Sequence, residues 1–66
     1  MKVKSSNIGS IDYDPQENLL HITFNSGRTY QYYNVPADIH EKLLSAPSIG
    51  GYFNDHIKNR YHYREE

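Results

Sequence analysis

The feature that most constrains the fold is a pair of alternating apolar segments joined by a short polar loop. Residues 19–24 read "LLHITF", and residues 28–32 read "RTYQY". Alternation with a period of two places every second side chain on the same face of a β-strand. The intervening residues 25–27, "NSG", have the length of a three-residue hairpin loop in which Gly27 supplies a positive φ angle. The pattern therefore predicts two antiparallel strands joined as a hairpin.

A third strand is predicted before this hairpin. Residues 8–14 also alternate, and Asp14 and Pro15 occupy positions that a type I turn favours. Pairing through that turn places Ile11 and Tyr13 opposite apolar residues of the middle strand. The chain is therefore expected to begin with a three-stranded antiparallel β-meander.

The tyrosines of the last strand divide between its two faces. Because pairing preserves the face, Tyr30 falls opposite Ile22 and Tyr32 falls opposite Leu20. Both rings are therefore expected in the core, with their hydroxyls at its rim. Tyr33 points the other way and is expected to be the more exposed of these three tyrosines.

Two amphipathic helices are predicted after the meander. Pro36 suits the first helical position, and Pro47 ends the first helical pattern. Ser48 is the expected N-cap of the second helix. The apolar residues at helical spacing are Ile39, Leu43 and Leu44 in the first helix, and Ile49, Phe53 and Ile57 in the second, where Tyr52 and Tyr61 flank the stripe. We therefore expect an α+β fold of the order β-β-β-α-α, with both helices packed on one sheet face and the other face open to water.

The chain length allows one domain over residues 1–66, with an ordered core at about 8–61. Cysteine is absent, so apolar packing alone must stabilise this core, without disulfides or thiolate zinc sites. No apolar run approaches the roughly 18 residues of a membrane span, and residues 1–10 are too polar for a signal peptide. We expect a cytoplasmic monomer with no membrane partner.

Several short motifs, taken in order, resemble the KTSC domain family. They are Leu20-x-Ile22-x-Phe24, Tyr30-x-Tyr32, Val35-Pro36 and Ala46-x-Ser48-x-Gly50-x-Tyr52-Phe53-Asn54-x-x-Ile57. The family takes its name from the C-terminus of some lysyl-tRNA synthetases and includes free-standing bacterial proteins of about this length. It commonly has an aromatic residue where this chain has His40. The resemblance implies a small accessory domain, and the synthetase context suggests RNA as a partner. The motif residues Tyr30, Tyr32, Tyr52, Phe53, Asn54 and Ile57 are expected to be mainly structural.

The segment from Ser48 to Gly51 is the first candidate binding site. Free amides and the helix dipole attract anions to a helix start, and Gly50 and Gly51 let a phosphate approach the backbone. The alternative is that Gly50 serves close packing and Ser48 is only a cap, and both interpretations stay open. The segment lacks the lysine and preceding strand of a nucleotide-binding loop, so neither ATP nor NAD is expected.

The second candidate segment, residues 56–64, interleaves basic and aromatic residues. Lys58 and Arg60 suit phosphate neutralisation, and tyrosines stack on unpaired bases, as in single-stranded RNA binding. Acidic neighbours at Asp55 and Glu65 favour the alternative of an ordinary solvated helix face.

Catalytic and metal chemistry are not expected, and no cofactor is predicted. The histidines are scattered without a metal-binding pair on one helix, at His21, His40, His56 and His62. No serine lies in a nucleophile-elbow pattern, and so small a fold has little room for a deep pocket of several hundred Å³.

Two functional hypotheses follow. The first is an RNA-binding accessory module for tRNA or single-stranded RNA, with contacts from Arg28, Tyr33, Ser48, Gly50, Gly51, Lys58 and Arg60. The second is a protein-interaction module that uses an unpaired sheet edge or the open sheet face, with Leu19, His21 and Tyr33. Added salt distinguishes the two hypotheses, because it should weaken phosphate binding steeply and leave an apolar protein contact almost unchanged.

Overall fold

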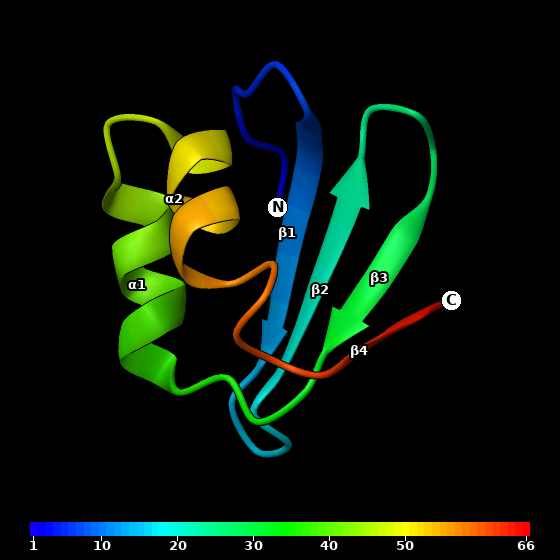
Figure 1. Ribbon diagram of the computed structural model, residues 1–66, viewed down its shortest axis with the longest axis vertical. Helices are drawn as coiled ribbons and strands as arrows, with labels where there is room; N and C mark the ends of the chain where they lie inside the picture. Colours follow the sequence, from blue (N-terminus) through cyan, green and yellow to red (C-terminus); the bar gives the residue numbers. More distant parts are fainter.

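A computed structural model describes residues 1–66 and has two layers, a four-stranded antiparallel sheet and two helices on one of its faces (Figure 1). The elements in chain order are β1 (Ile8–Asp14), β2 (Leu19–Phe24), β3 (Thr29–Tyr32), α1 (Ala37–Ser45), α2 (Ile49–His56) and β4 (Tyr63–Glu65). Strand order across the sheet is β1-β2-β3-β4. The α+β class and the placement of both helices on one face agree with the sequence prediction.

The predicted register of the first three strands is confirmed. Ile22 lies opposite Ile11 on one side and Tyr30 on the other, and Leu20 lies between Tyr13 and Tyr32 in the same way. Gly27 has the expected positive φ angle, at 97°. The hairpin loop therefore fixes the register, and the register aligns the apolar side chains on the face that the helices cover.

A β-bulge near Gly9 adds a core residue that simple alternation assigns to the other face. The pairing shifts between Ile8 and Ser10, and both Ile8 and Ile11 are buried although they are three residues apart. A bulge inserts one extra residue, so it turns the strand by one side-chain position. A Cβ atom on Gly9 would lie 3.0 Å from Oδ1 of Asn25, which explains why the smallest residue occupies the bulge.

The prediction of three strands is wrong by one. Residues 63–65 pair with β3 as a fourth strand, in which Tyr63 lies opposite Tyr32 and Glu65 opposite Tyr30. The segment is charged, exposed and only three residues long, so it carries no apolar pattern of its own. Backbone pairing with β3 holds it at the edge of the sheet.

The helix boundaries differ from prediction at two places. Pro36 is the N-cap of α1 rather than its first helical residue, with φ −67° and ψ 155°. Helix α2 ends at His56, and Ile57 is its C-cap. Lys58 and Arg60 therefore lie in the turn after α2 and not on a solvated helix face. The N-cap assignment of Ser48 is confirmed, because its side chain accepts a hydrogen bond from the Gly51 amide.

The core lies between the two layers and consists of Ile8, Ile11, Leu20, Ile22, Tyr32, Val35, Leu43, Phe53 and Ile57. Tyr32 is 3% exposed, as predicted, and Tyr30 is half-buried against the core. Tyr33 is also half-buried, and the exposed tyrosine is Tyr63 at 57%. The exposure predicted for Tyr33 is therefore only partial, because the segment that leads into β4 passes beside it and the Tyr33 amide donates to the His62 carbonyl oxygen.

His40 fills an aromatic position. Its ring stacks on that of Tyr13, with centroids 4.6 Å apart and planes inclined by 16°. The Tyr13 hydroxyl donates to the Val35 carbonyl oxygen at 2.6 Å, which fixes the ring beneath His40. Burial lowers the pKa of His40 below its ordinary value, and Glu41 partly opposes that shift. The imidazole therefore acts as a neutral aromatic surface between α1 and β1.

Lowering the pH from 7.5 to 5.5 is expected to lower the melting temperature through His40. In the unfolded chain, His40 takes up a proton near its ordinary pKa of 6.5. In the folded protein, the pKa of His40 is lower, so the ring takes up the proton only at a lower pH. The contribution of neutral His40 to the free energy of unfolding is thus complete above about pH 6.5 and is lost as the pH falls toward the pKa of the folded state. Melting curves of wild type and His40→Phe check this, since the variant keeps the stacked ring and should show a shallower decline. Parallel curves would show that His40 does not cause the decline, and His62→Gln at an exposed position serves as the control.

Candidate functional site

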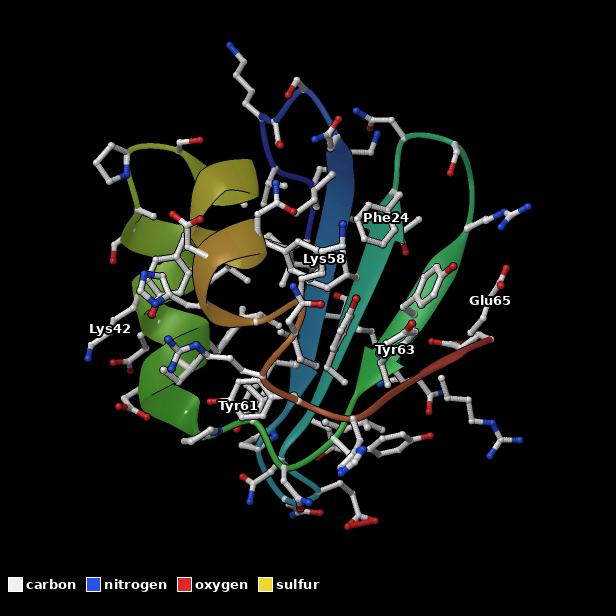
Figure 2. All side chains as sticks on the ribbon, in the orientation of Figure 1. Phe24, Lys42, Lys58, Tyr61, Tyr63 and Glu65 are labelled. Atoms are coloured by element: carbon white, nitrogen blue, oxygen red, sulfur yellow. The ribbon has the colours of Figure 1, made fainter.

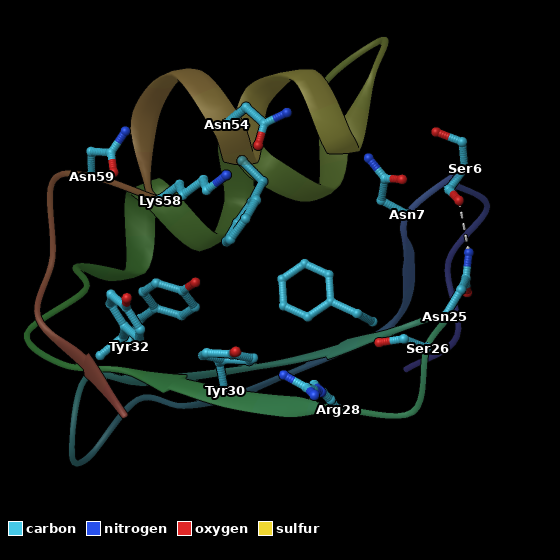
Figure 3. Close-up of a pocket in the computed structure, with 13 residues that line it drawn as sticks. Ser6, Asn7, Asn25, Ser26, Arg28, Tyr30, Tyr32, Asn54, Lys58 and Asn59 are labelled. Carbon is cyan, nitrogen blue, oxygen red and sulfur yellow. Dashed lines mark hydrogen bonds between the residues drawn. The ribbon is translucent and has the colours of Figure 1, made fainter. Parts of the chain in front are cut away.

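A pocket of about 500 Å³ opens between α2 and the strands β2, β3 and β4 (Figure 3). We call it the aromatic pocket, because its walls include Phe24, Tyr30, Tyr32, Phe53 and Tyr63. It is open to solvent on one side and is therefore not the deep, water-excluding pocket that the sequence made unlikely. Strand β4 completes one wall of the pocket, because it brings Tyr63 beside the tyrosines of β3.

The five aromatic rings form a closed cycle of contacts. Phe24 contacts Tyr30 and Phe53 edge-on, at centroid distances of 5.6 and 5.5 Å. Tyr32 contacts Phe53 at 5.4 Å and Tyr63 at 5.5 Å, and Tyr63 contacts Tyr30 at 5.6 Å. These separations suit favourable aromatic pairs, so each ring is held by two others.

The Tyr32 hydroxyl has no hydrogen-bond partner within the protein, although its ring is buried. Tyr32 lines the aromatic pocket, and its hydroxyl oxygen is not fully buried there. Burial raises the pKa of Tyr32 to about 12, with Tyr63 and Tyr30 adding to the shift. The group is therefore a neutral hydrogen-bonding hydroxyl at the pocket wall throughout the physiological pH range.

The rim of the aromatic pocket is polar and basic. Lys58 lies on the helix side and Arg28 on the sheet side (Figure 3). The remaining polar lining residues are Ser6, Asn7, Asn25, Ser26, Asn54 and Asn59. Glu65 lies just outside, with Oε2 3.9 Å from Nε of Arg28, and both side chains are exposed. Figure 2 shows Lys58 on the same side of the molecule as Phe24 and Tyr63, whereas Lys42 projects from α1 well away from them.

A second pocket of about 330 Å³, the helix-start pocket, adjoins the first at the beginning of α2. Ser6, Asn7 and Asn54 line both pockets, and Lys4 lines only the second. The pocket is formed where the N-terminal segment, residues 4–7, passes the start of α2. The two pockets therefore make one continuous track along α2.

The first turn of α2 shows the cap and the close packing that the sequence left open as one of two roles. Ser48 Oγ accepts from the Gly51 amide at 3.1 Å, so the cap already uses that donor. A Cβ atom on Gly50 would lie 3.2 Å from Ser5 Oγ, which indicates close packing against the N-terminal segment. Gly50 and Gly51 nevertheless both line the helix-start pocket, so their backbone remains reachable from it.

The structure gathers some of the predicted site residues and separates others. Arg28 and Lys58 meet at the aromatic pocket, and Ser48, Gly50 and Gly51 meet at the helix-start pocket. Arg60 and Tyr33 line neither pocket. Of the motif residues, Tyr30, Tyr32, Phe53 and Asn54 line the aromatic pocket, whereas Ile57 is buried in the core and Tyr52 packs against it.

Sequence reasoning missed several lining residues, namely Lys4, Asn7, Asn25, Asn59 and Tyr63. Tyr63 belongs to the basic and aromatic segment 56–64, which was the available signal for it. Nothing in the local sequence places the asparagines at a shared rim, because they come from distant parts of the chain.

The open sheet face offers less to a partner. Leu19, His21 and Tyr33 are all half-buried there. His21 Nδ1 and Glu66 Oε2 are 2.9 Å apart, and the Tyr33 hydroxyl lies 3.4 Å from Gln31 Oε1. These polar contacts occupy part of the face that the protein-interaction hypothesis requires.

No group of three His, Asp or Glu side chains in the structure is arranged to hold a metal ion. None of the helices has the length and apolar character needed to cross a membrane.

Fold and site together define a small two-layer α+β domain with an aromatic pocket beside its second helix. The family model described as the KTSC domain matches residues 4–61, and the chain belongs to this family. The resemblance inferred from the sequence motifs is thereby confirmed. A KTSC domain protein from Yersinia pestis, known from a crystal structure, superposes with a TM-score of 0.95 at 42% identity, covering 100% of this chain and 93% of that one.

Two kinds of relatives share the sequence. An uncharacterised protein from Stutzerimonas stutzeri (strain A1501) is 40% identical over 62 residues, which cover 94% of this chain and 86% of that protein. The lysine–tRNA ligase of Nostoc sp. (strain PCC 7120) is 37% identical over 65 residues, which cover 98% of this chain but only 12% of the ligase. The domain thus occurs both in proteins of similar length and as a small part of a synthetase.

Proposed function

We propose that this domain is a non-enzymatic accessory module that binds RNA through phosphate contacts along the aromatic and helix-start pockets. The charge of the pocket walls carries the proposal. Lys4, Arg28 and Lys58 line the two pockets, and no aspartate or glutamate does, although the chain has 8 acidic residues and a net charge of −1. A local positive strip attracts a polyanion even when the whole molecule has little net charge.

Two further observations support the proposal. The start of α2 presents backbone at Gly50 and hydroxyls at Ser5 and Ser6 beside Lys4, which are groups that contact phosphate in nucleic-acid complexes. The lysine–tRNA ligases with a similar segment act, by their name, on tRNA. An added RNA-binding module would suit an enzyme whose substrate is an RNA.

The wild-type protein is expected to bind single-stranded RNA and a tRNA pool weakly and with strong salt dependence. Three phosphate contacts on a single strand predict a slope of about −2 for log K against log salt concentration, because each contact contributes about −0.7. Fluorescence anisotropy of labelled RNA between 25 and 200 mM salt measures this slope. No binding at 25 mM would overturn the proposal and leave the protein-interaction module as the remaining hypothesis.

A further inference from the structure

We infer that the aromatic pocket receives one unpaired nucleobase of the RNA strand, while Lys58 and Arg28 hold the adjoining phosphates. The inference rests on the proposed function and names the part of the RNA that the pocket recognises. It is carried by the convergence of aromatic rings, free amides and positive charge at one pocket.

The aromatic cycle provides a surface for base stacking. Tyr32 and Phe53 are buried and form the floor, whereas Tyr30 is half-buried and Tyr63 is 57% exposed. The accessible ring surface therefore belongs to Phe24, Tyr30 and Tyr63, and the centroids of Tyr30 and Tyr63 are 5.6 Å apart. Every base has a π-face, and stacking on tyrosine is the usual way a protein holds an unpaired base.

Unused polar groups surround this surface. The Asn25 amide donates to the carbonyl oxygens of Ser5 and Ser6, and is thus engaged. The side chains of Asn7, Asn54 and Asn59 line the pocket without hydrogen bonds to the protein, as does the Tyr32 hydroxyl. Side-chain amides carry both donors and an acceptor, which match the mixed edges of a nucleobase.

Charge and size select among the ligands that an aromatic pocket attracts. Lys58 and Arg28 at the rim repel the cationic ligands that aromatic cages commonly bind. An apolar side chain of a protein partner would leave these cations and the free amides unpaired. A volume of about 500 Å³ lies within the range of small-molecule sites. A nucleoside phosphate combines a planar heterocyclic base with an anionic phosphate, and it therefore suits the cationic rim, the free amides and the volume of the pocket.

The experiment separates a base within a strand from a free nucleotide and from phosphate alone. Three probes are titrated at 50 mM salt. Two are labelled strands of eight residues, a single-stranded oligouridine and the same ribose-phosphate strand without bases. The third is free uridine monophosphate, whose binding is followed by NMR of the tyrosine rings. Oligouridine is expected to bind at least about fivefold more tightly than the abasic strand, since stacking on one base contributes that much. The monophosphate should shift the ring resonances of Tyr30 and Tyr63 at high concentration.

Tyr63 supplies the matched variants, because its ring is exposed and the core does not depend on it. Tyr63→Leu should reduce oligouridine affinity about fivefold and leave abasic binding unchanged, whereas Tyr63→Phe keeps the ring and should retain wild-type affinity. Equal binding of the two strands would overturn the inference while leaving RNA binding through phosphates intact. Ring shifts with the monophosphate but no binding of either strand would support a nucleotide pocket and overturn RNA binding. No response to any probe would overturn both.

Discussion

Truncation of Tyr32 to alanine is expected to lower the free energy of unfolding by about 3–5 kcal/mol, the usual range for a large buried aromatic residue. Tyr32 is 3% exposed and contacts both Phe53 and Tyr63, so its removal leaves a cavity beside α2 and loosens β4. A chain of 66 residues has a small core and correspondingly little stability in reserve. The variant should therefore be partly or wholly unfolded at 25 °C, as judged by circular dichroism and urea titration.

Tyr32→Phe is the matched control for this truncation. The hydroxyl of Tyr32 makes no hydrogen bond within the protein, so deleting it should change the free energy of unfolding by less than about 1 kcal/mol. For a domain of this size, each 1 kcal/mol corresponds to a shift in melting temperature of about 4–8 °C. If Tyr32→Ala melted within a few degrees of Tyr32→Phe, the ring would not belong to the core.

The sheet register could be predicted because two independent signals agree. The alternation of Leu20, Ile22 and Tyr30 defines one face, and Gly27 fixes the loop length that pairs them. The burial of Ile8 could not be predicted, because it depends on a bulge at Gly9, where a Cβ atom would come too close to Asn25 of the loop between β2 and β3. Local pattern thus determines regular pairing, and tertiary contact determines the irregularity.

The fourth strand and the place of Tyr63 in the aromatic pocket could not be predicted from the sequence, for the same reason. Tyr63 and Glu65 show no apolar alternation, and their pairing depends on an edge that exists only after β3 has formed. Without β4, the sequence gives no reason to place Tyr63 beside Tyr32. Arg28 and Lys58 were recognisable as candidate phosphate contacts from residue type, but their meeting at one pocket follows from the packing of α2 over the sheet.

Replacement of both Arg28 and Lys58 by glutamine should have the largest effect on RNA binding. Both side chains are exposed, and the contact of Arg28 with Glu65 is a surface ion pair of little energetic weight, so the melting temperature should remain nearly constant. Each phosphate contact with a single strand contributes about eightfold in affinity at 50 mM salt, relative to 1 M. Loss of two contacts should therefore weaken binding about 60-fold and reduce the salt slope by about 1.4.

The control for this double variant replaces Lys2 and Lys42, which line neither pocket, by glutamine. Both double variants change the net charge from −1 to −3, so they differ only in where the charge is removed. Glu65→Gln tests the opposite sign, since removing the carboxylate beside Arg28 should strengthen binding. An equal loss in both double variants would mean that RNA responds to the net charge of the domain, and the pocket walls would then have no special part in binding. A loss confined to Arg28 and Lys58, with a gain in Glu65→Gln, requires that the phosphates lie along the track between α2 and β3.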